Sequence, residues 1–374
     1  MASCEVNTDL SVDVRIRQSN QVTELFISVR PKAPADPAAQ ADAMMAMIAS
    51  LLRQHHAVIL QERIFADASV MALLAESRAR SYGQAVDPIG PTWLVVPENT
   101  CGPISGIQIH AVAGSSQPSL LYIDDEPHGR LLQYGRLRYL TGCNLLGDPE
   151  DPPASQARMM LLKAEQLLAQ SSATLADISR TWMWLGNILD WYNDFNRTRS
   201  DLFKDRGLLK PDATGNLPAS TGIGIGPAGH QQCAMDFCAT LEGPRPRFLL
   251  GASRQGPASK YGSAFSRAAV AGTPAGTAVY VSGTAAIDPA GQTTHIGDAR
   301  GQIEDTIQNI RGVLTDAGTC EQDIVHAIVY CKDRRVEQIF RQTWGNWPIP
   351  YILAIADVCR ENLLFEIEVT AMPL

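Results

Sequence analysis

The chain has 374 residues, of which 45% are hydrophobic and 19% are charged, a composition typical of globular proteins and unlike that of disordered or fibrous chains. This length allows two or more packed domains, since a domain usually takes roughly 100–200 residues. The formal net charge of −8 argues against nucleic acid or an anionic membrane as a partner, because both favour a basic surface.

The N-terminal region carries no motif that identifies a chemistry. Residues 1–7 show no basic segment followed by an apolar run, so we expect no signal peptide. The apolar stretch at 43–52 is too short for the roughly 20 residues of a membrane span. A helix over 39–53 and a strand over 57–64 fit the pattern of the region.

The cysteines predict a reducing, cytoplasmic environment. They show no C-x-x-C pairing and mostly lie in apolar runs, which indicates buried thiols and argues against a disulfide framework or a zinc site. The eight are Cys4, Cys101, Cys143, Cys233, Cys238, Cys320, Cys331 and Cys359.

Two segments, 136–240 and 277–372, resemble each other. Each contains a small-residue turn after a strand, then a helix with apolar residues at helical spacing. Asp177-Ile178 of the first segment recurs as Asp323-Ile324, 146 residues later, and leads into an apolar strand in both. A second helix, a proline-led strand and a closing strand follow. This β-α-β-α-β-β order predicts an α/β fold with helices on one face of a mixed sheet.

The helix between 191 and 203 carries polar and basic residues in the first segment. Helical spacing brings Tyr192, Asn196 and Arg199 close to one face, where they could line a cleft. Arg197 is a further candidate of the same run. The alternative is a helix with its aromatic residues in the core and its arginines in solvent.

The closing strand of the second segment places Glu366 and Glu368 on one face and Phe365, Ile367 and Val369 on the other. If the apolar face packs on helices, the carboxylates point towards the neighbouring module, where a desolvated glutamate can act as a general acid. A solvated or ion-paired couple of glutamates is the alternative.

Metal and dinucleotide sites are not predicted. Residues 224–229 fit G-x-G-x-x-G literally but precede a strand, whereas a dinucleotide fingerprint opens a helix. The seven histidines show no metal-ligand spacing. We therefore expect neither a metal nor a cofactor.

Several motifs resemble known families. Val281-Ser-Gly-Thr-Ala and Phe365-Glu-Ile-Glu-Val-Thr-Ala resemble the Rid/YjgF family, in which ligands bind between adjacent modules. Tyr261-Gly-Ser-Ala-Phe-Ser-Arg-Ala and Gly102-Pro-Ile-Ser-Gly-Ile-Gln-Ile resemble segments of the chorismatases. The resemblance covers most of the chain and implies an enzyme that splits chorismate into pyruvate and a cyclic carboxylate without a cofactor.

The resemblance also assigns roles to individual residues. Glu366 matches the family's catalytic glutamate, and Met235 is expected at the equivalent place in the first repeat. Arg267 matches the motif arginine and would bind a substrate carboxylate, with Tyr261 of the same motif and with Tyr192 or Arg199. Cys359 and Gly272 resemble the pair that marks the 3-hydroxybenzoate-forming type.

The resulting domain prediction has four parts: an N-terminal extension at 1–120, a first Rid-like module at 121–245, a linker at 246–276 and a second Rid-like module at 277–374. Three alternatives stay open: hydrolysis of chorismate to a dihydroxycyclohexadiene carboxylate, a Rid-type imine deaminase, and a metabolite-binding protein without activity. The arginine that follows the strand proline in Rid deaminases is missing after Pro218 and Pro350. We expect a monomer or a small homo-oligomer.

Overall fold

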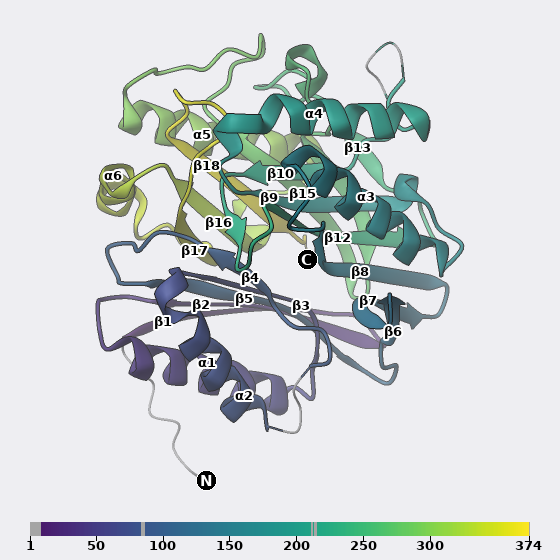
Figure 1. The fold of residues 1–374 in the computed structure, drawn as a ribbon, viewed down its shortest axis with the longest axis vertical. Helices are drawn as coiled ribbons and strands as arrows, with labels where there is room; N and C mark the ends of the chain where they lie inside the picture. The colour runs from purple at the N-terminus through teal and green to yellow at the C-terminus, as the bar shows by residue number, and fades with distance from the viewer. Residues whose placement is uncertain (1–8, 84–86, 211, 213–214, 374) are drawn as a thin grey trace.

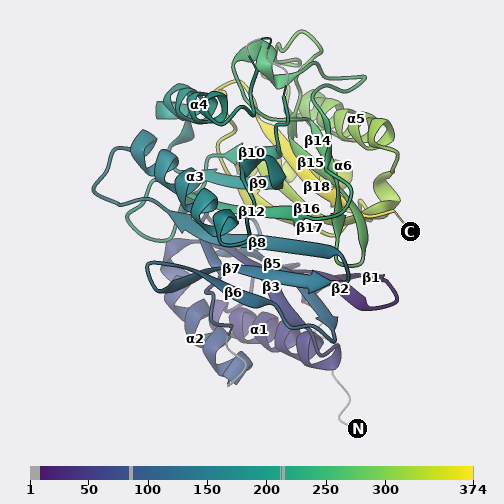
Figure 2. The ribbon, with the colours of Figure 1, turned by 90° about the vertical axis from the view of Figure 1, so that its right-hand side faces the viewer.

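The computed structural model describes residues 9–83, 87–210, 212 and 215–373. Three six-stranded sheets face one another, and the helices cover their outer sides (Figures 1 and 2). We call the three units, each a sheet with its two long helices, the N-terminal, middle and C-terminal modules. Cys4 and the stretch examined for a signal peptide lie outside the described residues.

The N-terminal module occupies the region expected as an extension. Its helix α1 and strand β3 confirm the helix and strand expected there. The apolar stretch at 43–52 lies in α1, whose Met44, Met45 and Ile48 pack against the sheet. Its elements are β1 (Leu10–Gln18), β2 (Val22–Pro31), α1 (Pro37–Gln54), β3 (Val58–Ala66), α2 (Met71–Tyr82), β4 (Thr92–Val95) and β5 (Ile104–Gly114).

The middle module has the elements expected from the first repeat, preceded by two further strands. A short strand, β11, leaves this module and pairs with β4 of the N-terminal sheet. The elements are β6 (Ser119–Ile123), β7 (Glu126–Tyr134), β8 (Leu137–Leu146), α3 (Pro153–Ala169), β9 (Ile178–Leu185), α4 (Ile188–Asp205), β10 (Ala219–Ile223), β11 (Gly226–Pro227) and β12 (Cys233–Leu241).

The C-terminal module includes part of the segment expected as a linker, because β13 and β14 pair into its sheet. Asp298 caps α5 by accepting a bond from the Gly301 amide, and Gly318 ends it with φ +87°. The elements are β13 (Arg247–Leu249), β14 (Ala268–Thr273), β15 (Gly276–Ala285), α5 (Ala299–Ala317), β16 (Ile324–Cys331), α6 (Arg334–Trp344), β17 (Tyr351–Ile355) and β18 (Phe365–Ala371).

The three sheets share one strand order. An antiparallel hairpin lies next to the closing strand, followed by the strand after the first helix and the strand after the second: β1-β2-β5-β3-β4, β7-β8-β12-β9-β10 and β14-β15-β18-β16-β17. The predicted repeat is therefore confirmed in the middle and C-terminal modules, and the N-terminal region adds a third unit with the same order.

A central core joins the modules. Phe26 and Leu60 of the N-terminal module, Trp182 of the middle module, and Tyr280 and Ile328 of the C-terminal module belong to one buried cluster. Each helix layer forms a separate core on the outer side of its own sheet. The inner faces of the sheets are thus where residues of different modules meet.

The described residues contain neither a membrane-spanning helix nor a metal-binding cluster. None of their helices is long and apolar enough to cross a membrane. Within the same residues, no group of three or more His, Cys, Asp or Glu side chains could hold a metal ion.

Candidate active site

A small, partly open chamber lies between the middle and C-terminal modules. It brings together Glu366, Arg267, Arg199, Tyr192, Tyr261 and Cys359, all expected as site residues. Residues that the sequence did not single out complete the lining, namely Ser220, Gly222, Phe265, Gly283, Ala285 and Ile287. The sequence-predicted residues therefore converge, although they come from four separate stretches of chain.

Glu366 lies on the inner face of β18 and is 4% exposed. Its neighbours Phe365 and Ile367 point the other way, into the core beneath α5 and α6, as the alternation predicted. Burial raises the pKa of the Glu366 carboxyl to about 8, nearby Glu368 adds to the rise, and the positive charges of Arg180 and Arg267 oppose it. A carboxyl in this environment keeps its proton at neutral pH, as a general acid requires.

Gly283 of β15 makes room for this carboxyl. A Cβ placed on Gly283 would lie 2.1 Å from Glu366 Oε1 and 3.0 Å from Thr221 Cγ2. No other residue type fits here without displacing the glutamate. Steric contact with Glu366 therefore explains the glycine in the Val-Ser-Gly-Thr-Ala turn.

Arg267 is 1% exposed and enters the chamber from the segment before β14. Its Nε donates to the Gly256 carbonyl oxygen at 3.0 Å, while its Nη2 is buried without a partner. The guanidinium lies 5.5 Å from the ring centroids of both Tyr261 and Phe265. A fixed, half-satisfied guanidinium of this kind is suited to binding a carboxylate.

The helix α4 supplies the opposite side of the chamber. Arg199 is 2% exposed and donates from Nη2 to Asn196 Oδ1 at 2.7 Å, and its Nε is buried without a partner. Tyr192 stacks on Phe195 with 6.0 Å between centroids. Arg197 points outward and pairs with Asp194, so the expected face contains Tyr192, Asn196 and Arg199 but not Arg197.

Of the two residues expected to set the product type, one lies in the chamber. Cys359 lines it, and burial raises the pKa of the thiol to about 12, with the charge of Glu366 contributing. Gly272 lies on β14 outside the chamber lining, where a Cβ would meet Leu137 and Thr240 at 3.4 Å. The structure therefore does not bring Gly272 to the substrate, because that part of β14 faces the middle module's sheet.

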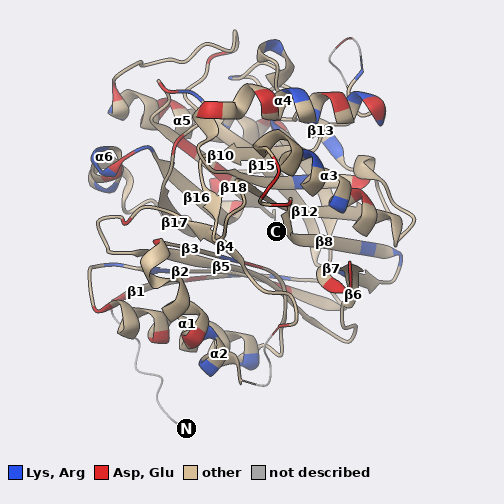
Figure 3. Cartoon of the chain, in the orientation of Figure 1, with Lys and Arg blue, Asp and Glu red and all other residues tan. Residues whose placement is uncertain are grey.

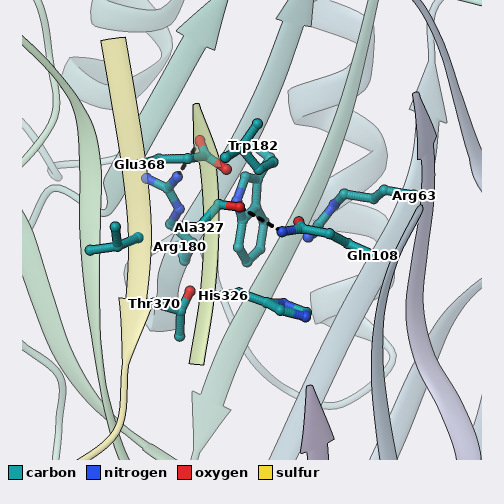
Figure 4. Close-up of a pocket in the computed structure, with 10 residues that line it drawn as sticks. Arg63, Gln108, Arg180, Trp182, His326, Ala327, Glu368 and Thr370 are labelled. Atoms are coloured by element: carbon teal, nitrogen blue, oxygen red, sulfur yellow. Dashed lines mark hydrogen bonds and ion pairs between the residues drawn. The ribbon is translucent and has the colours of Figure 1, made fainter. Parts of the chain in front are cut away.

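A buried ion pair lies behind Glu366. Glu368 Oε2 accepts from Arg180 Nη2 at 2.8 Å (Figure 4). The same nitrogen donates to Thr221 Oγ1 at 2.5 Å. Glu368 and Arg180 are 3% and 1% exposed. Glu368 is therefore ion-paired, which was one of the alternatives for this pair of glutamates. No signal in the sequence pointed to Arg180, because Arg180 and Glu368 lie 188 residues apart.

The chamber is narrow and is flanked by two larger hollows. The volume that the centre of a water molecule can occupy in it is about 30 Å³, which is enough for a few waters at most. Tyr261 of the chamber also lines a hollow of about 430 Å³ beside α4. Tyr192 and Cys359 of the chamber line a second hollow of about 460 Å³. Basic and acidic side chains alternate along α4 beside these hollows (Figure 3).

The other two module interfaces lack an equivalent acid. In each module, the penultimate residue of the strand after the first helix pairs with the position equivalent to Glu366. These pairs are Tyr330 with Glu366, Trp184 with Ala234, and Phe65 with Gly106. The expected equivalent, Met235, is thus one residue off, because the register places Met235 opposite Met183 on the helix side of the sheet. At Gly106 a Cβ would lie 2.7 Å from Ile352 Cγ2, so that interface is filled.

The chain is similar to known proteins in both sequence and fold. Residues 258–373 match the family described as Endoribonuclease L-PSP. A RutC family protein from Pyrococcus abyssi is 26% identical over 100 residues, which cover 26% of this chain and 79% of that protein. A crystal structure described as chorismatase matches with a TM-score of 0.60 and 18% identity, covering 97% of this chain and 98% of its own.

A putative endoribonuclease from Thermotoga maritima matches 34% of this chain and 98% of its own length, with 21% identity and a TM-score of 0.28. The chain has the fold of the chorismatase structure along nearly its whole length, and the family match falls on its C-terminal module. The resemblance expected from the motifs is confirmed at the level of the fold.

Proposed function

We propose that the protein is a chorismatase that splits chorismate into pyruvate and a hydroxybenzoate, 3-hydroxybenzoate in the first place. The observation that carries the proposal is one small chamber in which a buried carboxyl with a pKa of about 8 and two buried arginines line the same space. Chorismate carries two carboxylates and an enol ether, so it needs both kinds of group. The fold shared with a chorismatase over 97% of the chain supports the same assignment.

Glu366 acts as the general acid in this mechanism. Its proton goes to the methylene carbon of the enolpyruvyl ether, and the neighbouring ether carbon becomes an oxocarbenium centre. At pH 7 a carboxyl with a pKa of about 8 is about nine-tenths protonated, whereas an ordinary glutamate would be almost fully ionised. Because the enol ether is nucleophilic at its methylene carbon, protonation needs no cofactor.

The ring then loses pyruvate. The hydroxyl oxygen on the adjacent ring carbon attacks the carbon that bears the ether and gives up its proton, the ether C–O bond breaks, and its electron pair leaves with pyruvate, so that an epoxide remains on the ring. The epoxide oxygen then takes up a proton, its bond to the carbon that first carried the hydroxyl breaks, and loss of the hydrogen on the former ether carbon restores the aromatic ring as 3-hydroxybenzoate. That proton goes to solvent and Glu366 is reprotonated from solvent, so neither water nor a redox partner is consumed.

The arginines hold the substrate and Cys359 borders the ring. Arg267 and Arg199 each have a buried nitrogen without a protein partner, which suits them to the two carboxylates. Tyr192 and Tyr261 line the chamber beside them, and the side chains must part to admit a substrate into so small a space. Ser220, at the strand where an imine deaminase would carry its arginine, gives no support to that alternative.

The test is product formation from chorismate, followed by chromatography. The native protein should release pyruvate and hydroxybenzoate in equal amounts, and Glu366→Gln should lower turnover by at least about 10²-fold while the thermal unfolding curve stays that of a folded protein. Unchanged chorismate with the native protein would refute the assignment of substrate. Retained activity in the variant would refute Glu366 as the acid.

A further inference from the structure

The carboxylate two residues after Glu366 is also buried and is held from the other module. Glu368 shares the inner face of β18 with Glu366, and its partner Arg180 lies on β9 of the middle module. Both side chains of the pair are below 5% relative exposure. The pair therefore places one negative and one positive charge, little screened by water, directly behind the proposed acid.

Hydrogen bonds connect this pair to the backbone beneath Glu366. Thr221 Oγ1 accepts from Arg180 Nη2 at 2.5 Å and from the Gly283 amide at 3.0 Å. Gly283 is the residue on which a Cβ would reach Glu366 Oε1. Four strands of two modules, β18, β9, β10 and β15, are thereby joined around one carboxyl.

A second interface of the molecule contains the same device without the acid. Asp236 has the position of Glu368 on its own closing strand, since Asp236 pairs with Trp182 as Glu368 pairs with Ile328, 146 residues further on. It accepts from Arg63 Nε at 2.9 Å and from Thr92 Oγ1 at 2.7 Å. The glutamate position beside it is Ala234. Holding two modules together accounts for both pairs, but only Glu368 has a carboxyl to act on.

The groups that face Glu366 come from every element packed around it. Glu368 belongs to its own strand, Arg180 to β9, Arg267 to the segment before β14, Tyr330 to β16 and Cys359 to the loop before β18. Arg199 and Tyr192 of α4 and Tyr261 line the same chamber as Glu366. Burial raises the pKa of the Tyr330 hydroxyl and of the Cys359 thiol, and Glu368 is the ion-pair partner of Arg180. The charge of Glu368 opposes ionisation of Glu366.

We propose that the Glu368–Arg180 pair is a positioning element that keeps Glu366 protonated between turnovers. The negative charge of Glu368 disfavours ionisation of Glu366, and the positive charge of Arg180 partly offsets this effect. The catalytic use of the proton rests on the function proposed above. The charge coupling itself belongs to the free protein. The two residues therefore act in opposite directions on one proton, which a purely structural pair does not do.

The experiment is a titration of Glu366 in the free protein. The carboxyl is observed by infrared difference spectroscopy, with Glu366→Gln identifying its band, and the pH dependence of kcat/KM is measured in parallel. Glu368→Gln should move the Glu366 titration and the alkaline limb of the rate profile to lower pH, on the order of one pH unit. Arg180→Gln should move both to higher pH.

Asp236→Asn is the matched control, because it breaks the equivalent pair beside an alanine. It should lower thermal stability as Glu368→Gln does and leave the Glu366 titration in place. The proposal is overturned if Glu368→Gln leaves the titration unmoved, or if Asp236→Asn shifts it equally. If Glu368→Gln does not fold, Arg180→Gln is the deciding variant. A Glu366 titration that is unmoved or shifted to lower pH in Arg180→Gln refutes the coupling. The infrared titration needs no substrate, so its failure is distinguishable from an incorrect choice of chorismate.

Discussion

Arg267 is the residue on which substrate binding depends most directly. Its Nη2 is buried without a partner, and the flat guanidinium can make two parallel hydrogen bonds to a carboxylate, which lysine cannot. Arg267→Lys should raise KM for chorismate roughly 10–100-fold, the equivalent of one charge-assisted bond. Steady-state kinetics measures this effect. Arg197→Lys is the control on the exposed side of α4 and should leave KM unchanged.

Gly283 tests whether the position of the glutamate matters. Gly283→Ala would push the Glu366 carboxylate aside, because the added Cβ comes within 2.1 Å of Oε1. We expect kcat to fall at least tenfold, since misplacement of a reacting group by about 1 Å can cost about 10²-fold. Gly276→Ala, on the same strand, meets nothing closer than 3.9 Å and should retain full activity; equal losses in both variants would contradict the steric argument.

The pH dependence of turnover follows from the same residue. Glu366 must be protonated to act, and its pKa is raised to about 8, so activity should be retained through neutral pH and fall as the pH rises through about 8. A rate profile of kcat/KM from pH 5 to 10 measures this limb. A limb near the ordinary glutamate pKa of about 4.3 would show that Glu366 is ionised and cannot be the donor.

At the scale of elements, α5 offers a change that affects stability without touching the site. Asp298 Oδ1 accepts from the Gly301 amide at 3.1 Å as the helix cap. Asp298→Ala should lower the free energy of unfolding by about 1 kcal/mol, measured by urea denaturation, with kcat/KM unchanged. A loss of activity without a loss of stability would mean that α5 does more than support the sheet.

The elements of the two repeats were predictable because their signals are local. Apolar residues at helical spacing, the recurring Asp-Ile pair and the alternation around Glu366 depend only on neighbours in sequence. The register between strands is not local, which explains why Met235 was chosen where the structure has Ala234. Gly272 was misplaced for the same reason, since the motif does not reveal which way β14 faces.

At the scale of the whole molecule, the closed arrangement of three modules could not be inferred from the sequence. The N-terminal module has the same strand order as the others but does not repeat their motifs, so only its helix and one strand were predicted. The contact between Glu368 and Arg180 depends on how two modules pack, and residues 188 positions apart show no spacing signal. Glu366 and Arg267 were found because motifs carry them.

Of the three module interfaces, one carries the proposed acid. The positions equivalent to Glu366 are Ala234 and Gly106, and Ile352 closes the space at Gly106. Two interfaces thus serve to hold the modules, while the third keeps a space between them and carries the acid.

The fate of the transferred proton tests the central claim most directly. With native protein equilibrated in D2O and supplied with chorismate, protonation of the methylene carbon by Glu366 places one deuterium in the methyl group of pyruvate, which is trapped at once as lactate and examined by NMR. The account predicts one deuterium per methyl group, formed together with hydroxybenzoate. Pyruvate released without deuterium, or no pyruvate at all, would contradict it.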